Sequence, residues 1–136
     1  MNRKLTPADA CSIKFPALPA ALQQQTACLR LPCDQPRFRQ YTRITVAMED
    51  GAQVHALNLT NPVLRSYDIF AVRPTSEKAF QAACLTLEGV DIISLDLSTR
   101  LPFQLKRPYI FGALARGVSF EISYGSALRG MVASEM

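Results

Sequence analysis

Several features that support catalysis or membrane insertion are missing from this chain of 136 residues. A single histidine, His55, leaves too few ligands for most metal sites and too few bases for an activated nucleophile. The chain has no glycine-rich phosphate loop, no GxSxG motif and no paired-histidine motif. No stretch approaches the roughly 20 consecutive apolar residues that span a bilayer. We therefore expect no catalytic residues, metal, cofactor or membrane contact.

The cysteines do not form a CxxC pair, and their spacing is poor for a structural zinc site. Cys28 and Cys33 lie close together, but no second pair accompanies them. The basic start of the chain is not followed by a compact apolar run, so we expect no secretory signal and an intracellular location with reduced thiols. Cys84 belongs to an apolar helical pattern, which predicts packing in the core.

Positive charge is concentrated in one part of the chain, although the formal net charge is only +4. Residues 100–129 include five basic residues but only one acidic residue, Glu121. The basic residues are Arg100, Lys106, Arg107, Arg116 and Arg129. A local surplus of positive charge is typical of a protein that binds an anionic partner, most often nucleic acid. A solvated basic surface without a partner would have the same composition, so charge alone leaves both interpretations open.

The sequence changes character near Pro36. Residues 1–36 contain five prolines and three consecutive glutamines with little periodicity, so we expect an irregular segment that is open to disorder. Residues 37–136 carry clear strand and helix signals, and we expect them to form the folded domain.

Strand and helix patterns alternate from residue 41 onward. We expect strands at 41–48, 69–72, 90–95 and 118–122, and helices at 62–67, 77–88 and 108–116. The pair Asp50–Gly51 predicts a turn, with a return strand at 53–57. Alternating strands and helices predict an α/β fold with a parallel sheet, either open or part of a barrel. An eightfold barrel takes about 250 residues. If the fold is a barrel, we therefore expect this chain to hold only part of it and to be a fragment or a shortened isoform.

Cations are expected at the carboxyl ends of the parallel strands, where functional loops gather in α/β folds. Arg73 follows the second of these strands, and the long loop after the third contains Arg100, Lys106 and Arg107. Tyr124 and Ser126 follow the last strand. Together these side chains predict a rim that contacts phosphate groups.

Aromatic residues near this loop suggest a second kind of contact. Tyr109 and Phe103 are candidates for stacking on unpaired bases. The alternative is that Phe103 and Phe111 fill the barrel or cover helices, and for Phe111 we favour this packing role. Arg116 is expected at a helix end, where its charge offsets the helix dipole.

The residues of this loop and its neighbours resemble a known family. The strand Asp91–Leu95 leads into Leu101–Pro108, which reads LPFQLKRP, and Ala115–Tyr124 continues the pattern. Upstream, Tyr67–Phe80 contains a strand followed by TSEKAF. These motifs are similar to the signature of the thirty-kilodalton protein subunit of ribonuclease P and ribonuclease MRP, and the similarity runs from about residue 41 to residue 129.

The resemblance implies a fold like a TIM barrel, related to the PHP phosphoesterases but without their metal-binding histidines. It implies a non-catalytic subunit that supports the catalytic RNA in removing the 5′ leader of precursor tRNA and in rRNA processing, in the nucleus and nucleolus. The implied partners are the ribonuclease P/MRP RNA, a small protein subunit of the same holoenzyme and the other ribonuclease P proteins. Lys106 and Arg107 are then the first candidates for RNA contact, followed by Arg73 and Arg100.

Two departures from the family pattern keep other functions open. Residues 1–36 do not resemble the opening of the family, and family members continue well past Tyr124. One alternative is a PHP-like metal-dependent phosphoesterase, which needs a cluster of histidine and carboxylate ligands. Another is a fragment that interacts only with protein and never reaches the RNA.

Overall fold

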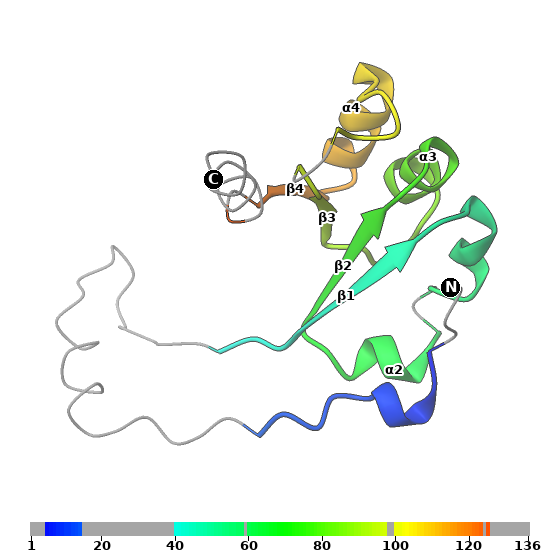
Figure 1. The fold of residues 1–136 in the computed structure, drawn as a ribbon. Helices are drawn as coiled ribbons and strands as arrows, with labels where there is room; N and C mark the ends of the chain where they lie inside the picture. The colour runs from blue at the N-terminus through cyan, green and yellow to red at the C-terminus, as the bar shows by residue number, and fades with distance from the viewer. Residues whose placement is uncertain (1–4, 15–39, 59, 98–99, 124, 126–136) are drawn as a thin grey trace, which may run out of the picture.

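A parallel sheet forms the centre of the computed structural model, which describes residues 5–14, 40–58, 60–97, 100–123 and 125. Its four strands are β1 (Arg43–Met48), β2 (Ile69–Pro74), β3 (Ile92–Leu95) and β4 (Ser119–Ile122), and they lie side by side in chain order (Figure 1). The helices are α2 (Pro62–Arg65), α3 (Glu77–Leu85) and α4 (Arg107–Ala115), with 3-10 turns η1 (Pro7–Asp9) and η2 (Gly51–His55). The predicted α/β class is confirmed, and the arrangement is consistent with part of a TIM-like barrel.

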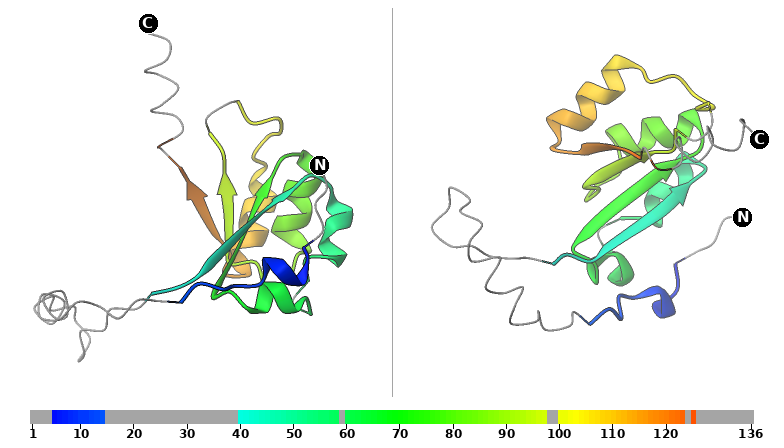
Figure 2. Two further views of the ribbon diagram at one scale, coloured as in Figure 1. Left: turned by 60° about the horizontal axis from the view of Figure 1, so that its bottom comes forward. Right: turned by 60° about the vertical axis from the view of Figure 1, so that its left-hand side comes forward.

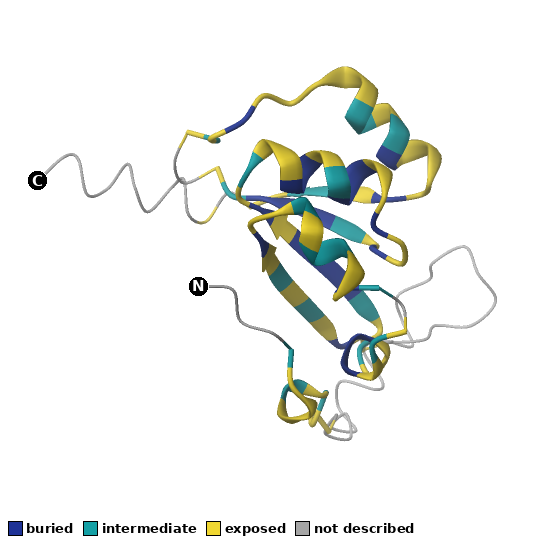
Figure 3. Ribbon diagram, turned by 90° about the vertical axis from the view of Figure 1, so that its right-hand side faces the viewer, coloured by how far each residue is buried: buried dark blue, intermediate teal, exposed yellow. Residues whose placement is uncertain are grey.

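Helices α3 and α4 cover one face of the sheet, and the other face is open (Figures 2 and 3). Side chains alternate along β1, with Ile44, Val46 and Met48 packed in or against the core. Strand β2 is almost continuously buried, as its apolar sequence predicts. The alternation on β1 therefore separates an apolar face under the helices from a polar open face.

Phe80 of α3 is at the centre of the core and is fully buried. Its ring stacks on Phe103 with centroids 5.0 Å apart, and it meets Tyr109 edge-on at 6.3 Å. Phe120 of β4 lies 6.5 Å away. One aromatic ring thus joins α3, α4, β4 and the loop before α4.

The helix ends follow local sequence rules. Asn61 accepts a hydrogen bond from the Val63 N–H at the start of α2, and Ser76 accepts one from the Ala79 N–H at the start of α3. Gly117 follows α4 with a φ of 81°, the left-handed conformation that ends helices at glycine. Helix α3 ends at Leu85, three residues earlier than predicted, and α4 matches its predicted range within one residue at each end.

The predicted return strand at 53–57 is wrong, because residues 51–55 form the 3-10 turn η2. The Gln53 side chain accepts hydrogen bonds from the backbone N–H groups of Glu49 and Asp50, which stabilises a helical start instead of a hairpin. Leu57 is buried three residues after the half-buried Val54, a helical spacing. Strand β1 therefore pairs in parallel with β2 rather than with a hairpin partner.

Arg116 links the two long helices. It follows α4, and its guanidinium donates hydrogen bonds to the backbone carbonyls of Cys84 and Leu87 at the end of α3. The positive charge of Arg116 therefore lies at the C-terminal ends of both α3 and α4, where it offsets the helix dipoles. Cys84 is buried as predicted, and burial raises the pKa of its thiol to about 11, so the thiol stays protonated at neutral pH.

Part of the predicted irregular N-terminal segment lies against the domain. The Tyr67 hydroxyl donates to the Asp9 carbonyl at 2.9 Å, and the Cys11 N–H donates to the Ser66 hydroxyl at 2.9 Å. These contacts hold η1 beside α2. Cys28 and Cys33 lie outside the described residues, and the division of the chain at residue 36 stays a prediction. Within the described ranges, no helix is long and apolar enough to cross a bilayer.

The aromatic centre gives a stability prediction. Replacing Phe80 with Ala should lower the free energy of unfolding by about 3–5 kcal/mol, because it leaves a cavity beneath Phe103 and Tyr109. Tyr41→Ala, which removes an exposed ring before β1, should change it by less than about 0.5 kcal/mol. Urea denaturation followed by circular dichroism measures both. Equal effects of the two substitutions would contradict this account of the core.

Candidate nucleic-acid interface

The loop before α4 is anchored by Phe103, which is only 7% exposed and stacked on Phe80. Arg100, Lys106 and Arg107 are exposed; Lys106 directly precedes α4, and Arg107 is the first residue of that helix. Of the two roles that the sequence left open for Phe103, stacking on bases is wrong and packing is confirmed, because its ring is covered by the core. Tyr109 is also half-buried, with its ring packed edge-on against Phe80.

Lys106 is held by an acid that the sequence analysis did not connect with it. Its ammonium forms an ion pair with Glu77 in the first turn of α3, and it lies 5.7 Å from the centre of the Tyr109 ring. The hydrogen bond to Glu77 raises the pKa of Lys106, so the lysine stays charged. The pair also ties the loop to α3, and part of its charge is neutralised before any partner arrives.

Arg107 lies in a different environment. Its guanidinium is 5.7 Å from the centre of the Phe111 ring, one helical turn along α4. Within the described part of the chain, neither Arg107 nor Arg100 has a carboxylate partner. Among the four predicted RNA-contacting residues, these two therefore have the least compensated charge.

Arg73 does not belong to the same cluster. It is the next-to-last residue of β2 rather than a loop residue, and it pairs with Ala47 of β1 in the sheet register. That register places its side chain on the open face, where its guanidinium lies 3.9 Å from the Asp96 carboxylate. The predicted rim is thus divided between the loop before α4 and the open face. Tyr124, Ser126 and Arg129, also predicted near it, lie outside the described residues.

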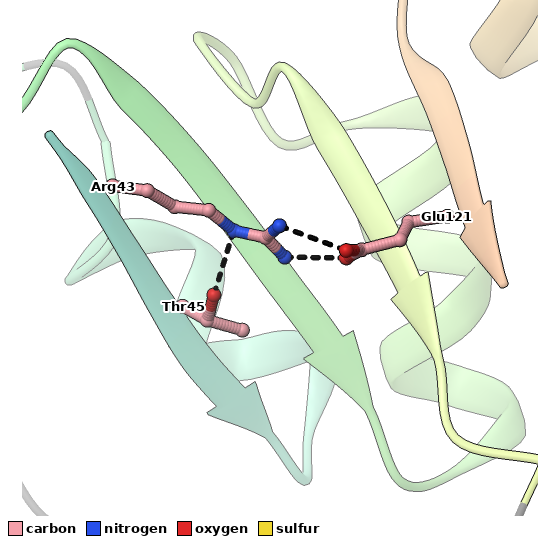
Figure 4. A network of polar contacts seen from close by, with 3 residues as sticks. All are labelled: Arg43, Thr45 and Glu121. Atoms are coloured by element: carbon pink, nitrogen blue, oxygen red, sulfur yellow. Dashed lines mark hydrogen bonds and ion pairs between the residues drawn. The ribbon is translucent and has the colours of Figure 1, made fainter. Parts of the chain in front are cut away.

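An ion pair across the open face connects the two outer strands of the sheet (Figure 4). Arg43 of β1 donates two hydrogen bonds to the Glu121 carboxylate of β4, at 2.9 and 2.5 Å, and its Nε donates to Thr45 at 3.0 Å. Ala71 and Ser94 lie on this face by their register and are nevertheless buried. The Arg43 side chain reaches over β2 and the Glu121 side chain over β3, so the pair lies above the two central strands (Figure 4).

The Arg43 guanidinium lowers the pKa of Glu121 to about 2, first through their hydrogen bond and further through its charge. A hydrogen bond from Ser94 acts in the same direction. The pair is about one-third exposed. Sequence reasoning missed this network because its two charged members are 78 positions apart. The available signal was one charged residue in each of two short strands, Arg43 in RITVAM and Glu121 in SFEI.

Metal-ligating side chains do not gather in the described ranges, where no group of three His, Cys, Asp or Glu residues could hold an ion. The single histidine, His55, is exposed at the end of η2 and is not on a strand as predicted. A hollow of about 430 Å³ lies between residues 5–12 and the outer edge of β1. Its ionisable lining includes Asp9, Glu49 and Tyr67, with no cation, so it is not part of the basic loop.

Comparison with known proteins decides the family. The model of the RNase P subunit p30 family matches residues 14–135. The chain belongs to this family. The match includes both the anchored loop and the four strands, so the resemblance inferred from the loop motifs is confirmed.

Similar proteins occur in plants, animals and fungi. Protein GAMETOPHYTE DEFECTIVE 1 of Arabidopsis thaliana is 45% identical over 130 residues, which cover 88% of this chain and 22% of that protein. Ribonuclease P protein subunit p30 of Mus musculus is 42% identical over 88 residues, or 65% of this chain and 32% of its own. Ribonuclease P/MRP protein subunit RPP1 of Saccharomyces cerevisiae is 33% identical over 100 residues, or 74% of this chain and 33% of its own. The chain thus spans about a fifth to a third of the length of these relatives.

The open-face ion pair predicts a pH dependence of stability. The pKa of Glu121 is lower in the folded chain than its ordinary value of 4.5, so its stabilising contribution is full above pH 4.5 and is lost as the pH falls toward about 2. The loss should be modest, about 1 kcal/mol or less, because the pair is partly exposed. Urea denaturation between pH 7 and pH 2.5 measures it.

The matched control is Glu121→Gln, which keeps the shape of the side chain and removes its titration. We expect this variant to lose stability at pH 7 and to show a shallower decline than the natural sequence on acidification. Identical pH profiles for the two proteins would show that Arg43 and Glu121 do not interact in solution.

Proposed function

We propose that this chain acts as a non-catalytic protein subunit of ribonuclease P and ribonuclease MRP, whose basic loop supports the RNA. The observation that carries the proposal is the pair Arg100, in the loop that Phe103 anchors to the core, and Arg107, the first residue of α4. Among the residues that the structure describes, neither cation has a carboxylate partner. Membership of the p30 family supplies the complex in which such a surface would act. The proposed tasks of that complex are removal of the 5′ leader from precursor tRNA and rRNA processing.

The electrostatics of the loop favour phosphate as its ligand. The start of α4 has a positive dipole end, and Lys106 and Arg107 add positive charge there instead of the acids that stabilise helix starts. This arrangement is unfavourable for the isolated helix, and an RNA phosphate would relieve it. Glu77 relieves it in part through Lys106. We therefore assign the stronger phosphate contact to Arg107 and a weaker one to Lys106.

The remaining predicted residues have different roles in this proposal. Arg100, exposed at the start of the loop, extends the positive surface. Arg73 on the open face lies beside Asp96, so we expect little contribution from it unless RNA reaches that face. The proposed protein partners are the small subunit of the holoenzyme and other ribonuclease P proteins, and the proposed location is the nucleus, including the nucleolus.

Salt dependence of RNA binding tests the assignment. Each lost phosphate contact should reduce the slope of log affinity against log salt by about 0.7 to 0.9. We expect Arg107→Ala to lose about one contact, Lys106→Ala to lose less, and the double variant to lose more than either. Binding to a ribonuclease P RNA transcript can be measured by filter retention at several potassium chloride concentrations.

Arg65→Ala serves as the control, because it removes an exposed cation from α2, away from the loop. It should leave the slope nearly unchanged. A slope that falls equally in Arg65→Ala and Arg107→Ala would mean that net charge alone determines binding, and the assigned residues would be wrong.

Purification from cells tests membership of the complex. A tagged copy of the chain should recover ribonuclease P RNA, detected by northern hybridisation, and Lys106→Ala/Arg107→Ala should recover less. Recovery of ribonuclease P proteins without the RNA, by both forms, would instead support a protein-only interaction fragment. Recovery of neither would contradict the proposed role for this chain.

A further inference from the structure

The exposed face of α4 carries an aromatic ring where the sequence predicted a packing residue. Phe111 is 58% exposed, in contrast to Phe103, which is 7% exposed. Arg107, Phe111 and Leu114 are spaced by four and three residues, so they lie on one side of the helix. The packing role favoured for Phe111 is therefore wrong, because this ring faces solvent, whereas Phe103 is in the core.

A cation with no acidic partner among the described residues accompanies this ring. The Arg107 guanidinium lies 5.7 Å from the ring centre, within the range of a cation–π interaction. Helix α4 contains no acidic residue between Arg107 and Ala115. Lys106, one position earlier, is on the anchored loop with its own contact to Tyr109. The ring thus belongs to a surface that is both aromatic and positively charged.

We propose that Phe111 and Arg107 form a stacking platform for one unpaired nucleotide of RNA, with the base on the Phe111 ring and its phosphate at Arg107. Unpaired bases stack on aromatic side chains and on guanidinium planes in most sequence-tolerant RNA contacts. The inference rests on the proposed function, and it specifies the form of RNA: a single-stranded or bulged position rather than a continuous duplex.

Charge distinguishes this ligand from a protein partner. Leu114 is 50% exposed, and Leu85, whose Cδ2 packs over Gly112, is 44% exposed, so an apolar surface continues along the helices. Such a surface by itself fits a protein equally well. The uncompensated Arg107 over the ring, next to a second cation, favours RNA, because a nucleotide supplies an aromatic face and a negative charge together.

The test compares single-stranded with duplex RNA on the full chain. The probes are a fluorescein-labelled, unstructured RNA of roughly 12 nucleotides and a duplex of the same sequence, with fluorescence anisotropy as the readout. Phe111→Ala should weaken binding of the single strand roughly 5- to 150-fold without changing its salt slope. Duplex binding should be unaffected, because its bases remain stacked on each other.

Matched variants separate the ring from its surroundings. Tyr41→Ala removes another ring that is 57% exposed, before β1, and should leave binding unchanged. Phe111→Trp preserves a stacking surface and should retain affinity for the single strand. Because Phe111 is exposed, thermal unfolding of these variants should match that of the natural sequence, which confirms that any loss concerns binding.

Two results would overturn the platform in different ways. If Phe111→Ala binds both probes normally while Arg107→Ala flattens the salt slope, the loop contacts phosphates only, and the proposed function survives without the platform. If Phe111→Ala keeps RNA binding but loses ribonuclease P proteins in cell purification, the α4 face is a protein-docking surface. If RNA binding by the unsubstituted protein does not depend on salt concentration, the proposed function is contradicted as well.

Discussion

The ion pair between Arg43 and Glu121 links the two outer strands of the sheet across its open face. It joins the first and last strands of a four-stranded arrangement, which in a flat sheet would lie about 14 Å apart, three spacings of about 4.8 Å. Contact over that span requires two long side chains reaching over the central strands and is helped by inward curvature of the sheet. The pair therefore favours the curved form that a barrel segment needs, and it covers Ala71 and Ser94 beneath it.

The two faces of the sheet are held together by different interactions. The helix face is joined by aromatic and aliphatic packing around Phe80, which depends on contact area and is insensitive to charge. The open face is joined by paired charges, Arg43 with Glu121 and Arg73 with Asp96. The carboxylates of Glu121 and Asp96 partly neutralise those two arginines. Arg100 and Arg107, in the loop before α4 and at the start of that helix, have no such partner among the described residues and can bind an anion.

Local patterns predicted most of the elements correctly. The caps Asn61 and Ser76, the stop at Gly117 and the apolar strand β2 depend on near neighbours in the chain, so their sequence carries the information. The prediction of a return strand at 53–57 was wrong because of another local interaction. The Gln53 side chain accepts hydrogen bonds from the N–H groups of Glu49 and Asp50, which favours a 3-10 turn over the hairpin that Asp50–Gly51 predicts. Within the candidate site, the exposed loop and its cations were predicted, but their partners were not.

The sequence by itself determined the family, the α/β class and the presence of a basic loop, because these depend on motifs, periodicity and composition. Only the tertiary structure decided which cations are compensated, and which phenylalanine is exposed. Glu77 contacts Lys106, which is 29 positions later in the chain, and Phe80 of α3 covers Phe103 of the loop before α4. Such pairings depend on how α3 and α4 pack against the sheet, and no local pattern in the chain specifies that geometry.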